Sequence, residues 1–460
     1  MHITPKSTTF VLLSFEGPDL YSQAGGLGVR MKGLSRTLAQ LGYETHLFFC
    51  GDPDLPSVEI LESGRLHYHR WCQWISAHHR EGVYDGEEDK LRDWNRSLPA
   101  AVVDDLIAPA LGAGRTVVVM GEEWQTATSM NLISDSLYYR GLRDRVVMLW
   151  NANNTFSFNR INWGALSFAS TITTVSRYMK FRMWDQGLNP VVIPNGIPRS
   201  SIVDPDPQAV EEMRAAAAAD HFCFKIGRFD PDKRWIMAVA ALGHLRLAGS
   251  RVRLLMRGGR EPHGVEVLLF ARAQGLEVAD VSTPDTASGL AGSLRAHPTA
   301  DVLNLTSYVS DELLALAYAS ADAVLANSSH EPFGLVGLEV MAAGGLVVTG
   351  STGEDYADDL RNALVLETDD PVELVTVLRL IKDRPALAAS IRKRGRATAR
   401  DYVWEHVVNQ LLMRIEFAAA QQAVRLAAAD RPATRPASRA RPRAKAAASR
   451  RVSRRVEPLP

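Results

Sequence analysis

Short apolar runs alternate with longer helical patterns along almost the whole chain, and this alternation constrains the fold most. Continuous apolar strands separated by helices are typical of parallel sheets covered on both faces. Such sheets bind ligands at the carboxyl ends of their strands. The pattern therefore predicts an α/β, doubly wound architecture. The expected strands are 9–15, 44–49, 116–120, 146–150, 171–175, 191–194, 222–227, 252–256, 302–305, 323–326 and 346–349.

The alternation is interrupted once, between Ile193 and about Asp220, by a turn-like Ile-Pro-Asn-Gly-Ile sequence and a Pro- and Asp-containing stretch. We expect the boundary there, with residues 1–200 forming one doubly wound domain and residues 201–430 a second. The 460 residues are enough for two cores of this size. Apolar positions from Trp404 to Ile415 follow the spacing of a one-sided helix, and the sequence leaves open which of the two domains it packs against.

Charge is unevenly distributed, although 52 basic and 52 acidic residues give a net charge of zero. Residues 431–460 hold nine Arg and one Lys against one acid, Glu457, so the other residues carry a net charge of −9. Neutrality excludes a wholly basic nucleic-acid binder. The Arg/Pro/Ala tail, 431–460, contains few large apolar residues and is expected to be disordered. A contact with nucleic acid or another polyanion through this tail remains open.

Three cysteines, Cys50, Cys72 and Cys223, lack metal-site spacing and are too few to cross-link a chain of this length. Their number fits a reducing compartment. No apolar run is long enough for a transmembrane segment. The expected localisation is therefore cytoplasmic.

The most specific motif is His330-Glu-Pro-Phe-Gly-Leu-Val-Gly-Leu-Glu339, directly after an expected strand. Glu331 falls in the strand-to-helix loop, where ligands bind in such sheets. The amides of Phe333, Gly334 and Leu335 begin the next helix and are suited to phosphate. A plainer interpretation of the isolated pair is also open, in which Glu331 offsets the helix dipole and Glu339 is solvated.

A second motif, Gly227-Arg228-Phe-Asp-Pro-Asp-Lys233, follows the first strand of the second domain. Two cations in this position are suited to a departing diphosphate, whose developing charge requires fixed positive groups. The alternative is a surface loop in which the two cations bridge Asp230 and Asp232.

These motifs resemble those of the retaining family-4 glycosyltransferases, which include the glycogen and starch synthases. In that family two Rossmann-like domains face each other across a cleft, an arrangement called GT-B. The resemblance implies that Glu331 contacts the donor sugar and that Glu339 binds the nucleotide ribose. It further implies that Arg228 and Lys233 hold the diphosphate. No metal and no cofactor is expected, with a nucleoside diphosphate sugar as the donor substrate.

A glycine-rich loop, Gly25-Gly26-Leu-Gly, follows the first strand and brings backbone amides close to any ligand. In the family this loop closes on the donor, which makes Gly25 and Gly26 candidate donor-binding residues. The synthases carry a Lys two residues before the paired glycines, whereas this chain has Gln23.

Two further segments of the first domain resemble family elements. Glu123, Trp124 and Gln125 correspond to an Asp-Trp-(His or Gln) element on the acceptor side. A buried Trp that anchors a helix is an equal alternative. The family's His-Asn pair is replaced here by Trp150 and Asn151, and Asn151 is a candidate for hydrogen bonding to the donor sugar.

The sequence therefore predicts a retaining, metal-independent glycosyltransferase that moves a hexosyl group from a nucleotide sugar to a carbohydrate or other hydroxyl acceptor. A related phosphorylase or sugar-nucleotide epimerase is one alternative. An inactive sugar-nucleotide-binding or scaffold protein is another. The sugar, the base and the acceptor remain open.

Overall fold

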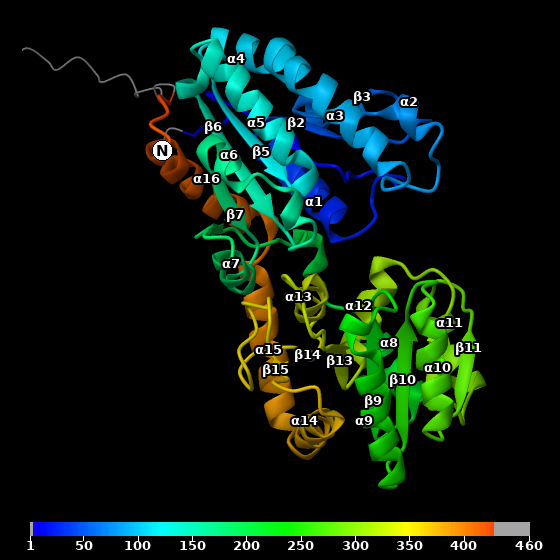
Figure 1. Ribbon diagram of the computed structural model, residues 1–460. Coiled ribbons are helices and arrows are strands. Elements are labelled where there is room, and N and C mark those ends of the chain that lie inside the picture. Colours follow the sequence, from blue (N-terminus) through cyan, green and yellow to red (C-terminus); the bar gives the residue numbers. More distant parts are fainter. Residues whose placement is uncertain (1–2, 427–460) are drawn as a thin grey trace, which may run out of the picture.

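A computed structural model describes residues 3–426, which form two α/β domains, each built around one sheet (Figure 1). This confirms the predicted fold class of two tandem doubly wound domains. The predicted disordered tail, 431–460, lies outside the described residues. Within residues 3–426 no helix is long and apolar enough to span a membrane.

The N-terminal sheet has the order β3-β4-β2-β1-β5-β6-β7-β8 and is parallel except for the β3–β4 pair. That antiparallel pair was missed because β3 alternates between exposed and half-buried residues and β4 between buried and half-buried ones, whereas the predicted strands are continuously apolar. The strands are β1 (Thr8–Leu13), β2 (Glu44–Cys50), β3 (Val58–Leu61), β4 (Leu66–Trp71), β5 (Thr116–Glu122), β6 (Val146–Ala152), β7 (Thr171–Thr174) and β8 (Val191–Val192).

Helices cover both faces of this sheet, as the doubly wound pattern requires. On one face Phe10 and Leu12 of β1 share a core with α1, and on the other Val11 and Leu13 share a core with α3 and α5. The alternation follows from the two-residue period of a strand. The helices are α1 (Gly26–Gln40), α2 (Gln73–Ser76), α3 (Glu87–Ala101), α4 (Ala108–Gly112), α5 (Trp124–Tyr139), α6 (Trp163–Ala169) and α7 (Arg177–Trp184).

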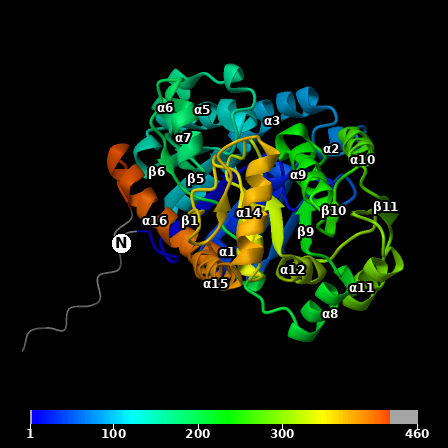
Figure 2. The same ribbon diagram turned by 90° about the horizontal axis from the view of Figure 1, so that it is seen from below.

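The C-terminal sheet is parallel throughout, with the order β11-β12-β10-β9-β13-β14-β15. The helices α9 and α10 lie on one face, and α8, α11 and α12 lie on the other (Figure 2). The strands are β9 (His221–Ile226), β10 (Val252–Arg257), β11 (Val278–Val281), β12 (Val302–Leu305), β13 (Ala323–Ala326), β14 (Val347–Thr349) and β15 (Leu364–Val365). The helices are α8 (Pro207–Ala217), α9 (Trp235–Leu247), α10 (His263–Ala273), α11 (Ala287–Ala296), α12 (Asp311–Ser320), α13 (Leu335–Ala342), α14 (Pro371–Asp383) and α15 (Pro385–Asp401).

The last described helix, α16 (Trp404–Gln421), returns to the N-terminal domain (Figure 1). Its apolar face, including Leu411 and Ile415, is buried with Phe10 and Leu12. The sequence left the packing partner of this helix open and grouped it with the range 201–430, whereas by packing it is part of the N-terminal domain. Close packing fixes this position, because a Cβ on Gly33 would come within 2.0 Å of the Trp404 ring.

Candidate active site

Each sheet reverses its strand order at one point, the switch point of that sheet. In doubly wound folds ligands bind at such points. In the C-terminal sheet the reversal lies between the neighbours β9 and β13, whose following loops hold Gly227–Arg234 and Asn327–Gly334. In the N-terminal sheet it lies between β1 and β5. The sequence motifs therefore fall at the two positions where the topology favours a ligand.

The C-terminal switch point brings Lys233 and Glu331 together from loops 98 residues apart. The Lys233 ammonium donates to a carboxylate oxygen of Glu331 in a charge-assisted hydrogen bond. Both side chains remain partly accessible, with 26% and 20% of their surface exposed. Two groups predicted to act on the donor are thus paired with each other and still reachable.

The loop that carries Lys233 starts with a glycine for a conformational reason. Gly227 has a φ of +150°, in the region that side chains rarely adopt. The carbonyl of the next residue, Arg228, accepts from the Trp235 indole N–H at 2.8 Å, and Arg228 itself is exposed. The backbone of Arg228 is therefore held in place beside Lys233, and its side chain is exposed to solvent.

Thr352 and Glu354, which were not among the predicted site residues, support the Glu331 loop. The hydroxyl of Thr352 accepts from the Glu331 backbone N–H at 2.9 Å, and both its hydroxyl and its N–H lie 3.3 Å from a Glu354 carboxylate oxygen. A Cβ on Gly353 would lie 2.1 Å from the Glu331 carbonyl, so the two loops are in close backbone contact. The Gly-Ser-Thr-Gly-Glu sequence directly after β14 is the sequence feature that could have indicated these two residues.

Glu354 is 6% exposed, and burial followed by the nearby charge of Glu331 raises its pKa to about 8. Desolvation disfavours the charged form of a carboxyl group, and a like charge adds to this effect. At neutral pH Glu354 is therefore largely a neutral acid beside the Lys233–Glu331 pair.

The second carboxylate of the motif, Glu339, lies one helix turn inside α13. The Tyr318 hydroxyl lies 3.5 Å from one of its oxygens, and burial is the largest cause of its raised pKa, followed by the charge of Asp311. Glu331, Glu339 and Glu354 all act electrostatically on Tyr356, whose pKa is raised first of all by burial. Both predicted glutamates therefore contribute to the raised pKa of Tyr356.

The turn between the two glutamates places Phe333 in the core, 3% exposed, with its ring 5.9 Å from that of Tyr356. Gly334 precedes α13 with a φ of +78°, and Leu335 is the first residue of this helix. The Tyr356 hydroxyl donates to the Gly334 carbonyl. Phe333 therefore anchors the turn, while Gly334 and Leu335 form the predicted helix start.

At the N-terminal switch point a carboxylate of the chain already occupies the glycine-rich loop. One oxygen of Glu16 accepts from the N–H groups of Ala24, Gly25 and Gly28 at 3.2, 3.0 and 3.0 Å. The other oxygen accepts from the Tyr84 hydroxyl at 2.6 Å. The Gly25 amide, predicted to face the donor, is thus bonded to Glu16. Gly26 is the first residue of α1, and a Cβ placed on it would have no neighbour within 4 Å.

Glu122 organises a buried network across the ends of three strands and α1. It accepts from Arg30 Nε at 3.2 Å and from the Asn151 amide at 2.9 Å, and Arg30 also donates to Asn195 at 2.6 Å. The Thr173 hydroxyl donates to the side-chain oxygen of Asn151 at 2.8 Å. Asn151 is 1% exposed, so the structure places this predicted donor-binding residue inside the scaffold.

The predicted acceptor-side residues are also buried. Glu123 accepts from the N–H of Asn153 at 2.6 Å, and burial is the main cause that raises its pKa to about 8. The Arg160 guanidinium lies 4.0 Å from the centroid of the Trp124 ring. Gln125 donates to Glu87 at 3.0 Å and so links α5 to α3. These buried residues stabilise the structure around the N-terminal switch point.

The carboxyl-end loops of the two domains meet directly. The Arg177 N–H, after β7, donates to Asp355 at 2.7 Å, and its guanidinium lies 3.3 Å from the same carboxylate. Asp355 follows Glu354 in the loop after β14. The loops after β7 and β14 are therefore in direct contact. No group of three or more His, Cys, Asp or Glu side chains suited to a metal is found in residues 3–426.

Residues 211–398 match the family model described as "Glycosyl transferases group 1". The matched region contains Arg228, Lys233, Glu331, Glu339 and Glu354. This identifies a glycosyltransferase domain in the C-terminal half of the chain, as the sequence predicted.

Curated relatives agree with this class, and solved structures match the fold. The chain is 30% identical over 189 residues to a D-inositol 3-phosphate glycosyltransferase of Nocardioides sp., covering 33% of this chain and 41% of the relative. The chain spans 27–54% of the length of the curated relatives it matches. Sucrose-phosphate synthase from Thermosynechococcus elongatus matches with a TM-score of 0.64 and 20% identity over 90% of this chain and 100% of that one. The catalytic domain of starch synthase IV from Arabidopsis thaliana, bound to ADP and acarbose, matches with a TM-score of 0.62 and 15% identity over 90% and 99%. These two likenesses concern the fold and support the GT-B arrangement.

Proposed function

We propose that the chain is a retaining, metal-independent glycosyltransferase that transfers a hexosyl group from a nucleoside diphosphate sugar to a hydroxyl acceptor. The observation that carries the proposal is the pairing of Lys233 with Glu331 at the C-terminal switch point, within the glycosyltransferase domain. A cation beside a carboxylate, both partly exposed, suits a substrate with a diphosphate leaving group and a sugar ring that becomes positive.

In the proposed step the bond between the anomeric carbon and the diphosphate oxygen breaks, and its electron pair leaves with the diphosphate. Lys233 and Arg228 stabilise that charge, and the Glu331 carboxylate stabilises the positive charge at the sugar ring. The acceptor oxygen then bonds to the anomeric carbon on the same face. Its proton passes to the departing phosphate oxygen.

A donor panel read by release of nucleoside diphosphate tests this function. UDP-, ADP- and GDP-sugars are offered with hydroxyl acceptors that include inositol 3-phosphate, hexose phosphates and short glucans. The names of the relatives and solved structures reported above motivate the choice of acceptors. We expect transfer with one donor, a product of unchanged anomeric configuration, and full activity in EDTA.

Two variants separate this chemistry from a contaminating activity. Glu331→Gln and Arg228→Ala should each lower turnover by about 10²- to 10³-fold, because each removes a group that stabilises transition-state charge. Near-normal turnover in both variants contradicts the assignment, and an inverted product contradicts the retaining mechanism.

A second candidate is a sugar-nucleotide-binding protein without transferase activity. It is favoured by Glu16, whose carboxylate already occupies the amides of the glycine-rich loop. In that case a nucleotide sugar would bind the C-terminal domain, and no acceptor on the panel would release the nucleoside diphosphate. Release with any acceptor excludes it.

A further inference from the structure

A large pocket lies at the opposite end of the N-terminal sheet from the candidate active site. It has a volume of about 1150 Å³ and is lined by segments that precede β6, β7 and β8, together with the last turn of α16. Asn151 and Arg177 follow β6 and β7, whereas Arg143 and Thr171 precede or begin them. The seven residues of β6 span roughly 20 Å, so the pocket is separate from the active site.

Aromatic side chains surround this pocket and are unusually exposed for their size. Tyr139 is 87% exposed, Phe168 85%, Tyr138 69% and Phe417 51%. They come from α5, α6 and α16, three elements distant in sequence. Exposed aromatic groups gathered around a hollow mark a binding site more often than scattered apolar residues do.

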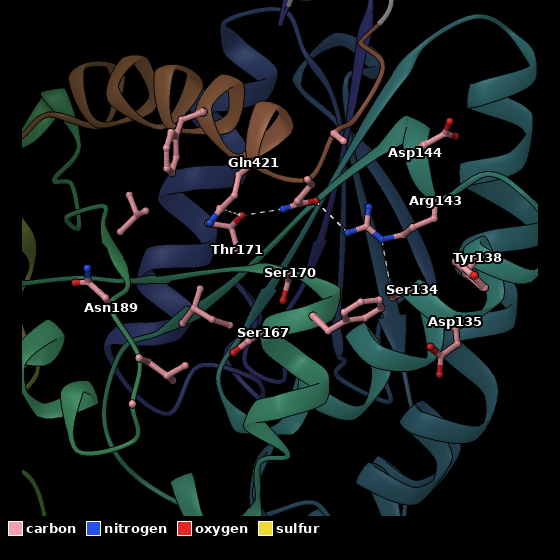
Figure 3. A pocket seen from close by; sticks show the side chains of 18 of the residues that line it. Ser134, Asp135, Tyr138, Arg143, Asp144, Ser167, Ser170, Thr171, Asn189 and Gln421 are labelled. Atoms are coloured by element: carbon pink, nitrogen blue, oxygen red, sulfur yellow. Dashed lines mark hydrogen bonds between the residues drawn. The ribbon is translucent and has the colours of Figure 1, made fainter.

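Between its apolar and aromatic side chains the pocket presents several polar groups, some of them fixed in position by hydrogen bonds. Figure 3 shows Ser134 and Asp135 on one side, Asn189 on another, and Thr171 beside Gln421. Thr171 donates to Gln421 at 3.0 Å. The neighbouring Gln422 exchanges hydrogen bonds with the backbone of β6 and so ties the end of α16 to the sheet. Hydroxyl, amide and carboxylate groups therefore line a preformed hollow.

The charges of the pocket select against an anionic ligand. Among its described lining residues Arg143 is the only basic one, and it already donates to Ser134, to two backbone carbonyls and to Gln422. Two acids, Asp135 and Asp144, also line the pocket, and Asp144 is paired with Arg425, so that cation is committed as well. A phosphate or nucleotide would find no uncommitted cation among these lining residues, whereas a neutral ligand rich in hydroxyl groups would find both donors and acceptors.

We propose that this pocket is a second carbohydrate site, which binds a neutral oligosaccharide away from the active site. Tyr139 and Phe168 stack on the apolar faces of pyranose rings, and the polar groups around Thr171 and Gln421 bond to ring hydroxyls. The inference does not depend on the proposed transferase activity, because it concerns binding at the opposite end of the sheet.

Saturation-transfer NMR with the full chain tests the site, using maltohexaose, cellohexaose and α-1,6-mannohexaose as probes at millimolar concentration. We expect at least one of them to bind, and we expect saturating UDP-glucose and ADP-glucose to leave that binding unchanged. Absence of binding by all three, or displacement by a nucleotide sugar, overturns the proposal.

Variants locate the binding. Tyr139→Ser combined with Phe168→Ser should weaken the affinity at least about tenfold, the equivalent of about 1.4 kcal/mol. Tyr308→Ser, which alters a tyrosine that is 73% exposed on the C-terminal domain, is the matched control and should have no effect. Unchanged affinity in the double variant shows that the sugar binds elsewhere and overturns the proposal. This experiment measures binding of an oligosaccharide, so a negative result does not affect the conclusion from the donor panel.

Discussion

Carboxylates lie at the switch points of both domains, but their exposure and their hydrogen-bond partners differ. In the N-terminal domain Glu16 accepts from three backbone amides and a tyrosine, and Glu122 is fully buried among Arg30 and two asparagines. In the C-terminal domain Glu331 keeps a fifth of its surface exposed and is paired with Lys233, which is itself accessible. The first set of charges is satisfied by the chain, while the second is left available to a ligand.

Topology alone therefore does not make a reactive site. Both loops lie at the carboxyl ends of parallel strands, yet the helix start at Gly25 is occupied by the internal anion Glu16. We infer that the N-terminal switch point acts as a scaffold and that donor chemistry is concentrated around Glu331 and Lys233. Substitution of Arg30 tests the scaffold role, and substitution of Lys233 tests the role in donor chemistry.

Arg30→Met should have the largest effect, on stability. It leaves the carboxylate of Glu122 buried without its cation, which typically costs about 3–5 kcal/mol. We expect a fall of that size in the free energy of unfolding measured with urea. The double variant Arg30→Met/Glu122→Leu should recover much of the loss, because it removes the stranded charge as well.

Lys32→Met is the matched control for Arg30, because Lys32 lies on the same helix with its side chain exposed. It should change the free energy of unfolding by less than about 0.5 kcal/mol. A small loss for Arg30→Met, equal to that of the control, would show that the N-terminal network is not a scaffold.

Lys233→Ala tests the opposite half of the comparison and should act on rate. We expect turnover in the transfer assay to fall by about 10²- to 10³-fold, or roughly 3–4 kcal/mol of transition-state stabilisation. The free energy of unfolding should change little, since the ion pair is partly solvated. Lys393→Ala, an exposed lysine on α15, is the control. If Lys233→Ala reduced stability and spared turnover, the pair would be structural.

Apolar continuity allowed the sequence to predict most of the fold. Buried parallel strands such as β1 and β5 are apolar on both faces, and their motifs mark the following loops. The pair β3–β4 was not predicted because it is half exposed. The packing partner of α16 stayed open because its apolar face is equally compatible with either domain.

The site was predicted in part, for a related reason. Lys233 and Glu331 were predicted as site residues because each motif directly follows a strand, and the structure brings their side chains together. Local spacing does not reveal that Glu16 turns back to the amide of Gly25 or that Asn151 is enclosed by Glu122. Such contacts depend on long-range packing.

Glu354→Gln should alter the pH dependence of stability. In the folded chain the Glu354 pKa is about 8, against an ordinary value of 4.5. The folded chain therefore keeps a proton that the unfolded chain releases, so the wild-type free energy of unfolding falls as pH rises from about 4.5 to about 8. The variant has no carboxyl group to ionise at this position. Its free energy of unfolding should therefore fall less between these pH values, with a difference on the order of 1–3 kcal/mol at pH 8.

Glu123→Gln offers the same measurement in the other domain, since the pKa of Glu123 is also raised to about 8. Both variants should flatten the decline in stability above pH 4.5, but only Glu354→Gln should also shift the pH profile of transfer. Its carboxyl group is coupled to Glu331, whereas Glu123 belongs to the scaffold. Equal pH profiles of transfer in the two variants would remove the distinction between the domains.

Arg177→Ala should have the smallest effect, although Arg177 joins the two domains. Its guanidinium is 66% exposed, so the ion pair with Asp355 is screened by water and should contribute no more than about 1 kcal/mol to the free energy of unfolding. Its backbone N–H still donates to Asp355 in the variant. Arg182→Ala, an exposed arginine on the same helix, serves as the control. A loss of transfer greater than about tenfold would mean that this contact sets the arrangement of the two switch points, which would then act as one unit.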